Sequence, residues 1–394
     1  MSSTHHVEGH TLTLLRNGEE YFPRLIAAID NAVDSIYLET YIFAADASGK
    51  MFSAAMQRAA KRGVAVHLLM DGFGSSEFSK GWELELRAAG VQVLWFRPEI
   101  ARFSLRRQRL HRLHRKLAIV DKSIAFVGGI NIINDVPGGP VKLPRLDYAV
   151  ELKGATVAHI YAPMRRLWTL VSWTNFRRRH ESAHEKFHPL HPVRATDKGH
   201  KVAFLLRDNL RHRHEIEQAY LGAINGAQYE IIIANAYFLP GQRLRRALLS
   251  AVQRGVRVVL LLQGRVEYRL QHYATLALYD ELLSAGVEIN EYYASYLHAK
   301  VAVVDGNWAT VGSSNIDPFS LWLGREANLV IRDEGFAAAL RSSLLHEIAT
   351  ASHPVKHYVW RTKKLWRRLL ARASYMVARM LTGLIGYARG GDDV

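Results

Sequence analysis

The sequence predicts an α/β protein made of two similar halves, and three observations lead to this fold class. Four sequence blocks of the first half recur in the same order in the second half. Both halves alternate short β-branched runs with helical stretches. A content of 49% apolar and 22% charged residues is typical of folded domains. The matching blocks are residues 29–43 with 224–238, 61–72 with 253–264, 89–91 with 285–287, and 114–121 with 298–305.

The repeat can be divided into predicted strands and helices. In the first half, strands are expected over residues 35–43, 64–70, 91–96 and 116–120, and helices over residues 51–62 and 82–89. Strands that alternate with helices favour a mostly parallel sheet with helices on its faces. Gly63 and Gly255 each follow a predicted helix, where a left-handed residue commonly ends the last turn. We place the first domain at residues 1–190, the second at 191–355 and a tail at 356–394.

The composition favours some classes of function and excludes others. Lys and Arg outnumber Asp and Glu by 52 to 36, which gives a net charge of +16 and favours polyanions or anionic membrane surfaces. The chain has no cysteine, which excludes disulfides, zinc-thiolate sites and a cysteine nucleophile. No signal peptide is visible, and no stretch reaches the roughly 18 apolar residues of a spanning helix. A soluble or peripheral protein is therefore expected.

The fourth block carries a motif with chemical meaning, His-x-Lys-x4-Asp, at His114 and again at His298. Residues two apart on a strand share a face, so each His projects together with Lys116 or Lys300. An imidazole beside an ammonium can attack or protonate a phosphoryl group while the cation holds a phosphate oxygen. One such strand is usually accidental, but two copies at equivalent places in a repeat indicate a site.

Further polar residues accompany both copies. Asp121 and Asp305 end the two strands and can order local hydrogen bonds. Turns of small residues follow, and each ends in an asparagine 17 residues after the His, so that their amides and hydroxyls can bind an anion. An acid lies farther on, where a carboxylate on the second imidazole nitrogen would fix the tautomer. These residues are Ser313, Asn131, Asn315, Asp147 and Glu326.

At these residues the sequence resembles the phospholipase D superfamily, whose pattern is two H-x-K-x4-D motifs followed by G-[GS]-x-N. The resemblance covers roughly residues 10–350. It implies two α/β/α sandwich domains packed face to face around one active site, and metal-independent ping-pong chemistry without a cofactor. By this analogy His114 is the nucleophile and His298 the acid/base. The two lysines and two asparagines bind phosphate, and Asp147 and Glu326 orient the histidines.

Within the superfamily, the chain is similar to bacterial cardiolipin synthases of the B type. Segments that carry this resemblance include YLETYIF at residues 37–43 and IIIANAYFLPG at residues 231–241. The implied reaction moves a phosphatidyl group from one phosphatidylglycerol to another and releases glycerol, on the cytoplasmic face of the bacterial cell membrane. A phospholipase D hydrolase, a phosphatidylserine synthase, an endonuclease and a degenerate phosphate-binding scaffold are the alternatives. No nucleic-acid partner is expected.

Three basic segments are open to two interpretations each. Residues 102–115 hold six arginines, which suit either a loop that attracts anionic headgroups or nucleic acid, or a solvated helix. The linker at 176–200 contains four closely set histidines, and a solvated linker is favoured over a metal site. Residues 364–388 have helical periodicity with arginines between apolar positions. That pattern suits a helix on the membrane interface or one packed on its own domain.

Overall fold

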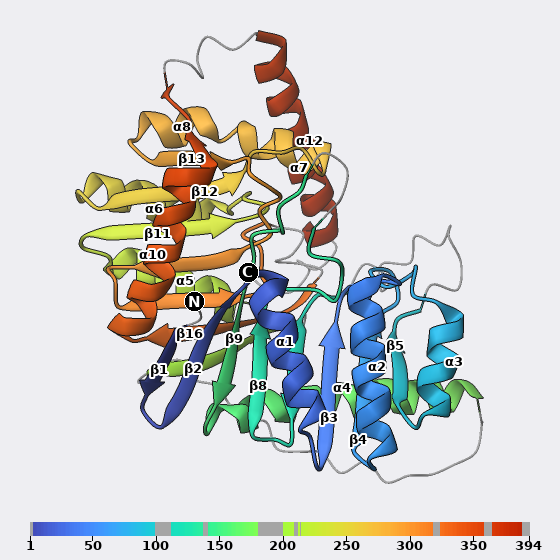
Figure 1. Cartoon of the computed structure of the whole chain (residues 1–394). Coiled ribbons are helices and arrows are strands. Elements are labelled where there is room, and N and C mark those ends of the chain that lie inside the picture. The colour runs from blue at the N-terminus through green and yellow to red at the C-terminus, as the bar shows by residue number, and fades with distance from the viewer. Residues whose placement is uncertain are drawn as a thin grey trace.

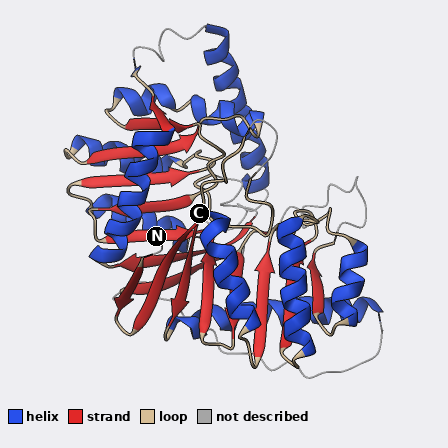
Figure 2. Ribbon diagram, in the orientation of Figure 1, coloured by secondary structure: helices blue, strands red, loops and turns tan. Residues whose placement is uncertain are grey.

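The two halves of the chain form two β-sheets with helices on their faces (Figures 1 and 2). The computed structural model describes residues 3–98, 112–136, 141–179, 200–208, 212, 214–317, 324–357 and 365–387. Most of the first basic segment and of the histidine-containing linker lies outside the described residues, so the interpretations of both remain predictions.

The first sheet has the strand order β1-β2-β9-β8-β7-β3-β4-β5. Only β3 with β4 and β4 with β5 pair in parallel, and the other neighbours are antiparallel. Its strands are β1 (Thr4–Val7), β2 (His10–Arg16), β3 (Ser35–Thr40), β4 (Ala65–Asp71), β5 (Gln92–Phe96), β7 (Lys116–Val120), β8 (Ile124–Gly128) and β9 (Tyr148–Lys153).

The second sheet repeats this arrangement in the order β10-β16-β15-β14-β11-β12-β13-β17. Its strands are β10 (Val202–Arg207), β11 (Glu230–Asn235), β12 (Arg257–Gln263), β13 (Glu288–Tyr292), β14 (Lys300–Val304), β15 (Trp308–Gly312), β16 (Gly324–Arg332) and β17 (Ser352–Pro354). The short strand β6 (Arg112–Leu113) comes from the first half but pairs with β16, so the backbone joins the two halves directly.

The expectation of a mostly parallel sheet was wrong, because both sheets are mixed. After the parallel strands β3, β4 and β5, the chain returns through antiparallel β7, β8 and β9. The tight turn between β7 and β8 has positive φ at Asp121 and Lys122, and that between β14 and β15 at Asp305 and Gly306. Turns this short join antiparallel strands, whereas parallel neighbours need a long crossover.

Helices cover the outer faces of the two sheets and enclose two separate cores. In the first half these are α1 (Asn17–Asp30), α2 (Ala47–Lys61) and α3 (Lys80–Ala88). In the second they are α5 (Glu215–Gly226), α6 (Gln242–Gln253), α7 (Arg269–Leu276) and α8 (Tyr279–Ser284). Gly63 and Gly255 follow α2 and α6 with φ of +91° and +88°, which confirms the predicted left-handed helix ends.

A third core lies between the two halves and holds them together. It combines apolar side chains of both sheets with α4 (Thr156–Arg179) and α10 (Glu334–Ala351). Helix α4 also contacts β10 of the other half, and α10 contacts β1 and β2. Strands β7 and β14 are buried at all five positions, which explains their uninterrupted apolar runs.

The C-terminal helix α12 (Leu365–Tyr387) lies along α7 at the edge of the second half (Figure 1). Over residues 369–380, whose side chains the structure describes, the buried residues are small: Ala371 and Ala378 are 1% exposed, and Ser374 is buried as well. Among the described residues, no helix is long and apolar enough to cross a bilayer.

Candidate active site

The two motif histidines lie on opposite sides of one cavity. The backbone amide of each one is hydrogen-bonded to the backbone of the other half. The His114 amide donates to the Arg325 carbonyl at 3.1 Å, and the His298 amide donates to the Leu146 carbonyl at 2.8 Å. The residue before each His is anchored too. Asp71 Oδ2 accepts from the Leu113 amide at 2.8 Å, and Gln263 Oε1 accepts from the Leu297 amide at 3.1 Å.

The carboxylate that orients each histidine comes from the opposite half. His114 Nδ1 lies 2.9 Å from a carboxylate oxygen of Glu326, which belongs to β16. His298 Nδ1 lies 2.6 Å from Asp147 Oδ2, in the residue before β9. A carboxylate that accepts a hydrogen bond from Nδ1 keeps the proton of the neutral ring on that nitrogen. Nε2 is then unprotonated, so each imidazole can present a lone pair to the cavity. Neither half can therefore assemble a complete His–carboxylate pair alone.

The motif lysines are fully buried and take a different position from the one expected. Lys116 Nζ donates to the His114 carbonyl at 2.7 Å, and Lys300 Nζ donates to the His298 carbonyl. Neither lysine is among the residues that line the cavity. Burial lowers the pKa of Lys116 to about 7 and also lowers the pKa of Lys300. The lysine charges therefore act on the cavity from a short distance, and they are strong there because the buried protein around them screens charge less than water does.

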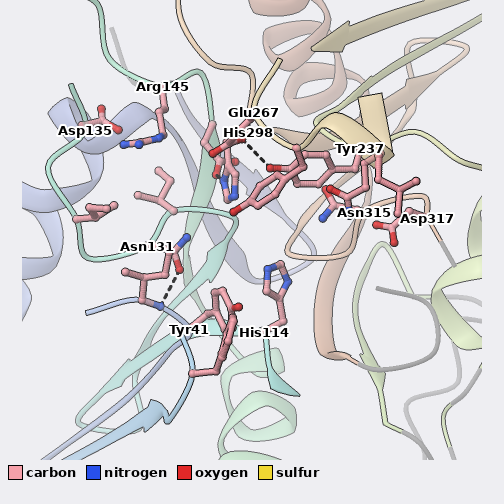
Figure 3. Close-up of a pocket in the computed structure, with 18 residues that line it drawn as sticks. Tyr41, His114, Asn131, Asp135, Arg145, Tyr237, Glu267, His298, Asn315 and Asp317 are labelled. Carbon is pink, nitrogen blue, oxygen red and sulfur yellow. Dashed lines mark hydrogen bonds and ion pairs between the residues drawn. The ribbon is translucent and has the colours of Figure 1, made fainter. Parts of the chain in front are cut away.

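The cavity has a volume of about 480 Å³ and is open to solvent (Figure 3). Both motif histidines, both motif asparagines and Asp147 line it. Residues that the sequence did not single out also line it; they lie outside the two motifs and their turns, most of them in loops. These are chiefly Tyr41, Phe73, Asp135, Arg145, Tyr237, Glu267, Tyr268, Gln271 and Asp317.

The two glycine-containing turns differ in a way that affects the acids. Ser313 Oγ donates to Glu326 Oε2 at 2.5 Å, so Ser313 supports the acid and is not directed at a phosphate. Its counterpart in the first repeat is Gly129. A Cβ atom there would come within 2.3 Å of Asp147 Oδ1, so only glycine leaves room for that carboxylate. Asn131 Oδ1 accepts from the Ile42 amide at 3.1 Å at the cavity wall.

The pKa values of the two acids are consequently shifted in opposite directions. Burial raises the pKa of Asp147 to about 6, with the positive charge of Lys300 opposing this effect. Burial also acts to raise the pKa of Glu326, but His114, Lys116 and the Ser313 hydroxyl together hold it below its usual value. Burial lowers the pKa of His114, and burial with the nearby Lys300 and Lys116 lowers that of His298 further. Both imidazoles are therefore neutral at pH 7 in the empty site.

The motif aspartates lie away from the cavity, at the other end of the five-residue strands that begin with the lysines. Asp121 accepts hydrogen bonds from the amides of Val33, Asp34 and Ser35. Asp305 does the same for residues 228–230. A strand of this length separates its ends by roughly 15 Å. The structure therefore does not group these aspartates with the reacting residues, and instead they fix the turn before β3 or β11.

Comparison with known proteins places this geometry in a family. The model of the phospholipase D-like domain of cardiolipin synthase matches residues 25–136 and 220–347. The chain belongs to this cardiolipin synthase family. It is 38% identical to cardiolipin synthase B of Shigella flexneri over 381 residues, which are 96% of this chain and 90% of the relative. Cardiolipin synthase B of Escherichia coli K12 is 37% identical with the same coverage.

The fold of a solved structure agrees with this membership. Phosphatidylserine synthase from Haemophilus influenzae Rd KW20 matches with a TM-score of 0.68, over 98% of this chain and 96% of that chain. Its sequence identity of 14% supports likeness of fold alone. The predicted superfamily and the predicted pair of α/β domains are both confirmed.

Proposed function

We propose that the protein is a phosphatidyltransferase that makes cardiolipin and glycerol from two phosphatidylglycerol molecules through a covalent phosphohistidine. One observation carries the mechanism: two histidines from different halves face one cavity, and each is oriented by the carboxylate of the opposite half. Two imidazoles at one phosphorus provide a nucleophile and a separate acid/base, which is what a two-step exchange requires.

In the first step His114 Nε2 attacks the phosphorus of the donor lipid. A nitrogen–phosphorus bond forms, the bond to the headgroup glycerol oxygen breaks, and His298 gives that oxygen a proton. His298 must therefore be protonated when the donor is bound, although its pKa is low in the empty site. The phosphodiester supplies the reason, because its negative charge offsets the repulsion from Lys300, Lys116 and Arg145 that disfavours the imidazolium.

In the second step the neutral His298 removes a proton from a hydroxyl group of the second phosphatidylglycerol. The resulting oxygen attacks phosphorus, the nitrogen–phosphorus bond breaks, and His114 leaves as a neutral imidazole. Asp147 stabilises the His298 imidazolium after this proton transfer, as the aspartate does in a Ser-His-Asp triad. Hydrolysis or phosphatidylserine synthesis would follow if water or serine replaced the second lipid.

We further propose that helix α12 attaches the enzyme peripherally to an anionic bilayer on the cytoplasmic face of the membrane. Over residues 369–380, whose side chains the structure describes, the helix packs on its own domain through Ala371, Ser374, Ala378 and the half-buried Tyr375. Five large apolar side chains of this stretch remain exposed: Leu369, Leu370, Met376, Val377 and Met380. At about 100° per residue, Leu369, Met376 and Met380 lie within about 40° of one another, opposite the buried stripe. Arg372 and Arg379 flank them and suit anionic headgroups.

The function is tested with purified protein and phosphatidylglycerol vesicles, in parallel with added serine and with plasmid DNA. We expect cardiolipin and glycerol in equal amounts from the wild type, and a loss of several orders of magnitude in H114A and H298A. Phosphatidic acid as the main product would indicate a hydrolase instead, phosphatidylserine would indicate a serine transferase, and DNA cleavage without lipid turnover would indicate a nuclease.

A further inference from the structure

The cavity has an acidic wall that phosphate binding does not explain. Besides Asp147, the carboxylates of Asp135, Glu267 and Asp317 line it. Carboxylates repel a bound phosphodiester, but they are good acceptors for hydroxyl groups, which a polyol headgroup supplies. The acidic residues therefore indicate a place for a hydroxyl-bearing group beside the phosphate.

Glu267 is the most accessible of these acids, and its position is fixed. It lies between β12 and α7 and accepts a hydrogen bond from the Tyr237 hydroxyl at 2.7 Å. The Tyr237 ring packs edge-on against Tyr268, with centroids 5.6 Å apart. The neighbouring Arg265 anchors this loop, because its Nε donates to the Tyr293 carbonyl at 2.7 Å. The other carboxylate oxygen of Glu267 accepts from no other described residue, which leaves it available to a ligand.

The Glu267–Tyr237 pair has no counterpart at the equivalent positions of the first half. In the repeat alignment, Tyr237 corresponds to Ile42 and Glu267 to Ser75, so the first half places no acid there. Glu267 and Tyr237 lie near His298, whereas Tyr41 lies beside His114 (Figure 3). The His298 side is therefore the one equipped for an alcohol, which agrees with its role as the acid/base that protonates and deprotonates alcohol oxygens.

A cation stands on the opposite side of His298 from this pair. Arg145 lines the cavity, and its charge is among the causes that lower the pKa of His298. Its backbone amide donates to the Asp135 carbonyl at 2.9 Å, and its side chain donates to the Asn134 carbonyl at 3.0 Å. The guanidinium is only partly buried, and it retains donors for an anion that enters from solvent.

On the basis of the proposed function, we infer that Glu267, Tyr237 and Arg145 form the subsite for the acceptor, a phosphodiester that carries a short polyol. Glu267 accepts a hydrogen bond from the hydroxyl next to the reacting one, and Tyr237 holds the carboxylate in place. Arg145 pairs with the acceptor's own phosphate, which three carbons separate from the reacting oxygen. Serine fits poorly, because its carboxylate would face Glu267, and water gains nothing from either contact.

Changes in the proposed subsite should affect two acceptors differently. Free glycerol has the neighbouring hydroxyl but no phosphate, whereas phosphatidylglycerol has both. Acceptance of glycerol is measured as incorporation of labelled glycerol into phosphatidylglycerol, and acceptance of lipid as cardiolipin formation. The donor step is measured separately, as the first turnover of glycerol release. The variants are E267Q and R145Q, with E288Q as the matched control, because Glu288 is an exposed acid paired with Arg257 away from the cavity.

E267Q should raise the KM for both acceptors about tenfold, the usual effect of losing one hydrogen bond to a charged group. R145Q should raise the KM for phosphatidylglycerol by about tenfold or more and change that for free glycerol less than about twofold. The donor step in E267Q should slow by a similar factor, because glycerol release is the microscopic reverse of glycerol acceptance and the departing glycerol occupies the same subsite. E288Q should resemble the wild type throughout.

Wild-type KM values for both acceptors in E267Q would overturn the subsite, as would an equal effect of R145Q on glycerol and on lipid. If the wild type instead released no glycerol from phosphatidylglycerol in the first turnover, the proposed function itself would fail. The two failures are therefore distinguishable.

Discussion

Replacing Asp147 with asparagine should stabilise the folded protein although it disables the site. Asp147 is 3% exposed, and its pKa is raised from 3.8 to about 6, chiefly by burial. A difference of about 2 in pKa corresponds to about 3 kcal/mol, by which the charged carboxylate disfavours the folded state at neutral pH. Because the folded-state pKa is raised, stability is greatest below the unfolded-state pKa and is lost as pH rises through about 6.

Asparagine preserves only one of the two acceptor oxygens and carries no charge. Its Oδ1 can still accept from the Tyr148 amide, whereas its amide group replaces Oδ2 and faces His298 Nδ1. At pH 7.5, D147N should therefore raise the free energy of unfolding by up to about 3 kcal/mol. At pH 4.5 the gain should shrink below about 1 kcal/mol, because the wild-type carboxyl is then protonated in the folded state. Turnover should fall by about 10⁴-fold, as in the corresponding change of a Ser-His-Asp triad.

E326Q is the matched control, because the same chemical change should have the opposite effect on stability. The pKa of Glu326 is lowered, so its charge stabilises the folded state above the unfolded-state pKa and this contribution is lost as pH falls. At pH 7.5, E326Q should be less stable than the wild type while it also loses activity. Urea unfolding followed by circular dichroism at both pH values measures these effects. A D147N protein less stable than the wild type at pH 7.5 would refute the reasoning, as would a gain that does not depend on pH.

Three other predictions concern pH, metals and the membrane. Because the pKa values of His114 and His298 are lowered, kcat/KM should persist below pH 6.5. Above about pH 7, kcat/KM should fall as Lys116 loses its proton. A pH profile that stays flat to pH 9 would contradict this. Activity should survive exhaustive chelation, because imidazolium and ammonium groups can neutralise phosphoryl oxygens; complete loss that one divalent ion restores would disprove it. M376S/M380S should bind phosphatidylglycerol vesicles more weakly than wild type, by about thirtyfold if each methionine contributes about 1 kcal/mol, yet turn over detergent-dispersed substrate normally. Equal vesicle binding would exclude α12 as the attachment.

The reacting residues could be predicted from the sequence because the repeat shows them twice. A single His-x-Lys strand carries little information, but His114 and His298 stand at equivalent places with equivalent turns. The pairing of His114 with Glu326 and of His298 with Asp147 could not be predicted, because it depends on how the two halves pack. A sequence pattern orders residues along one chain and contains no information on which half contacts which.

Strand direction was missed although a local signal was present. Asp305-Gly306 stands between two apolar runs, which is a strong signal for a hairpin, and β14 and β15 are joined there. In the first half Lys122 replaces that glycine, so the signal is weaker. Helix α12 presents another case, because periodicity located an amphipathic helix but not its buried face. Over residues 369–380 the buried stripe consists of Ala371, Ser374 and Ala378, whereas five larger apolar side chains are exposed: Leu369, Leu370, Met376, Val377 and Met380.

The most direct test of the account is to identify the residue that carries the phosphatidyl group during turnover. Wild-type enzyme is mixed with labelled phosphatidylglycerol and quenched in alkali within one turnover, and the modified peptide is then located by mass spectrometry. We expect an acid-labile, alkali-stable adduct on His114, absent in H114A and formed at the rate of glycerol release. An adduct on His298 would reverse the roles of the two histidines, and an adduct on serine or aspartate, or cardiolipin formed without any adduct, would contradict the phosphohistidine mechanism.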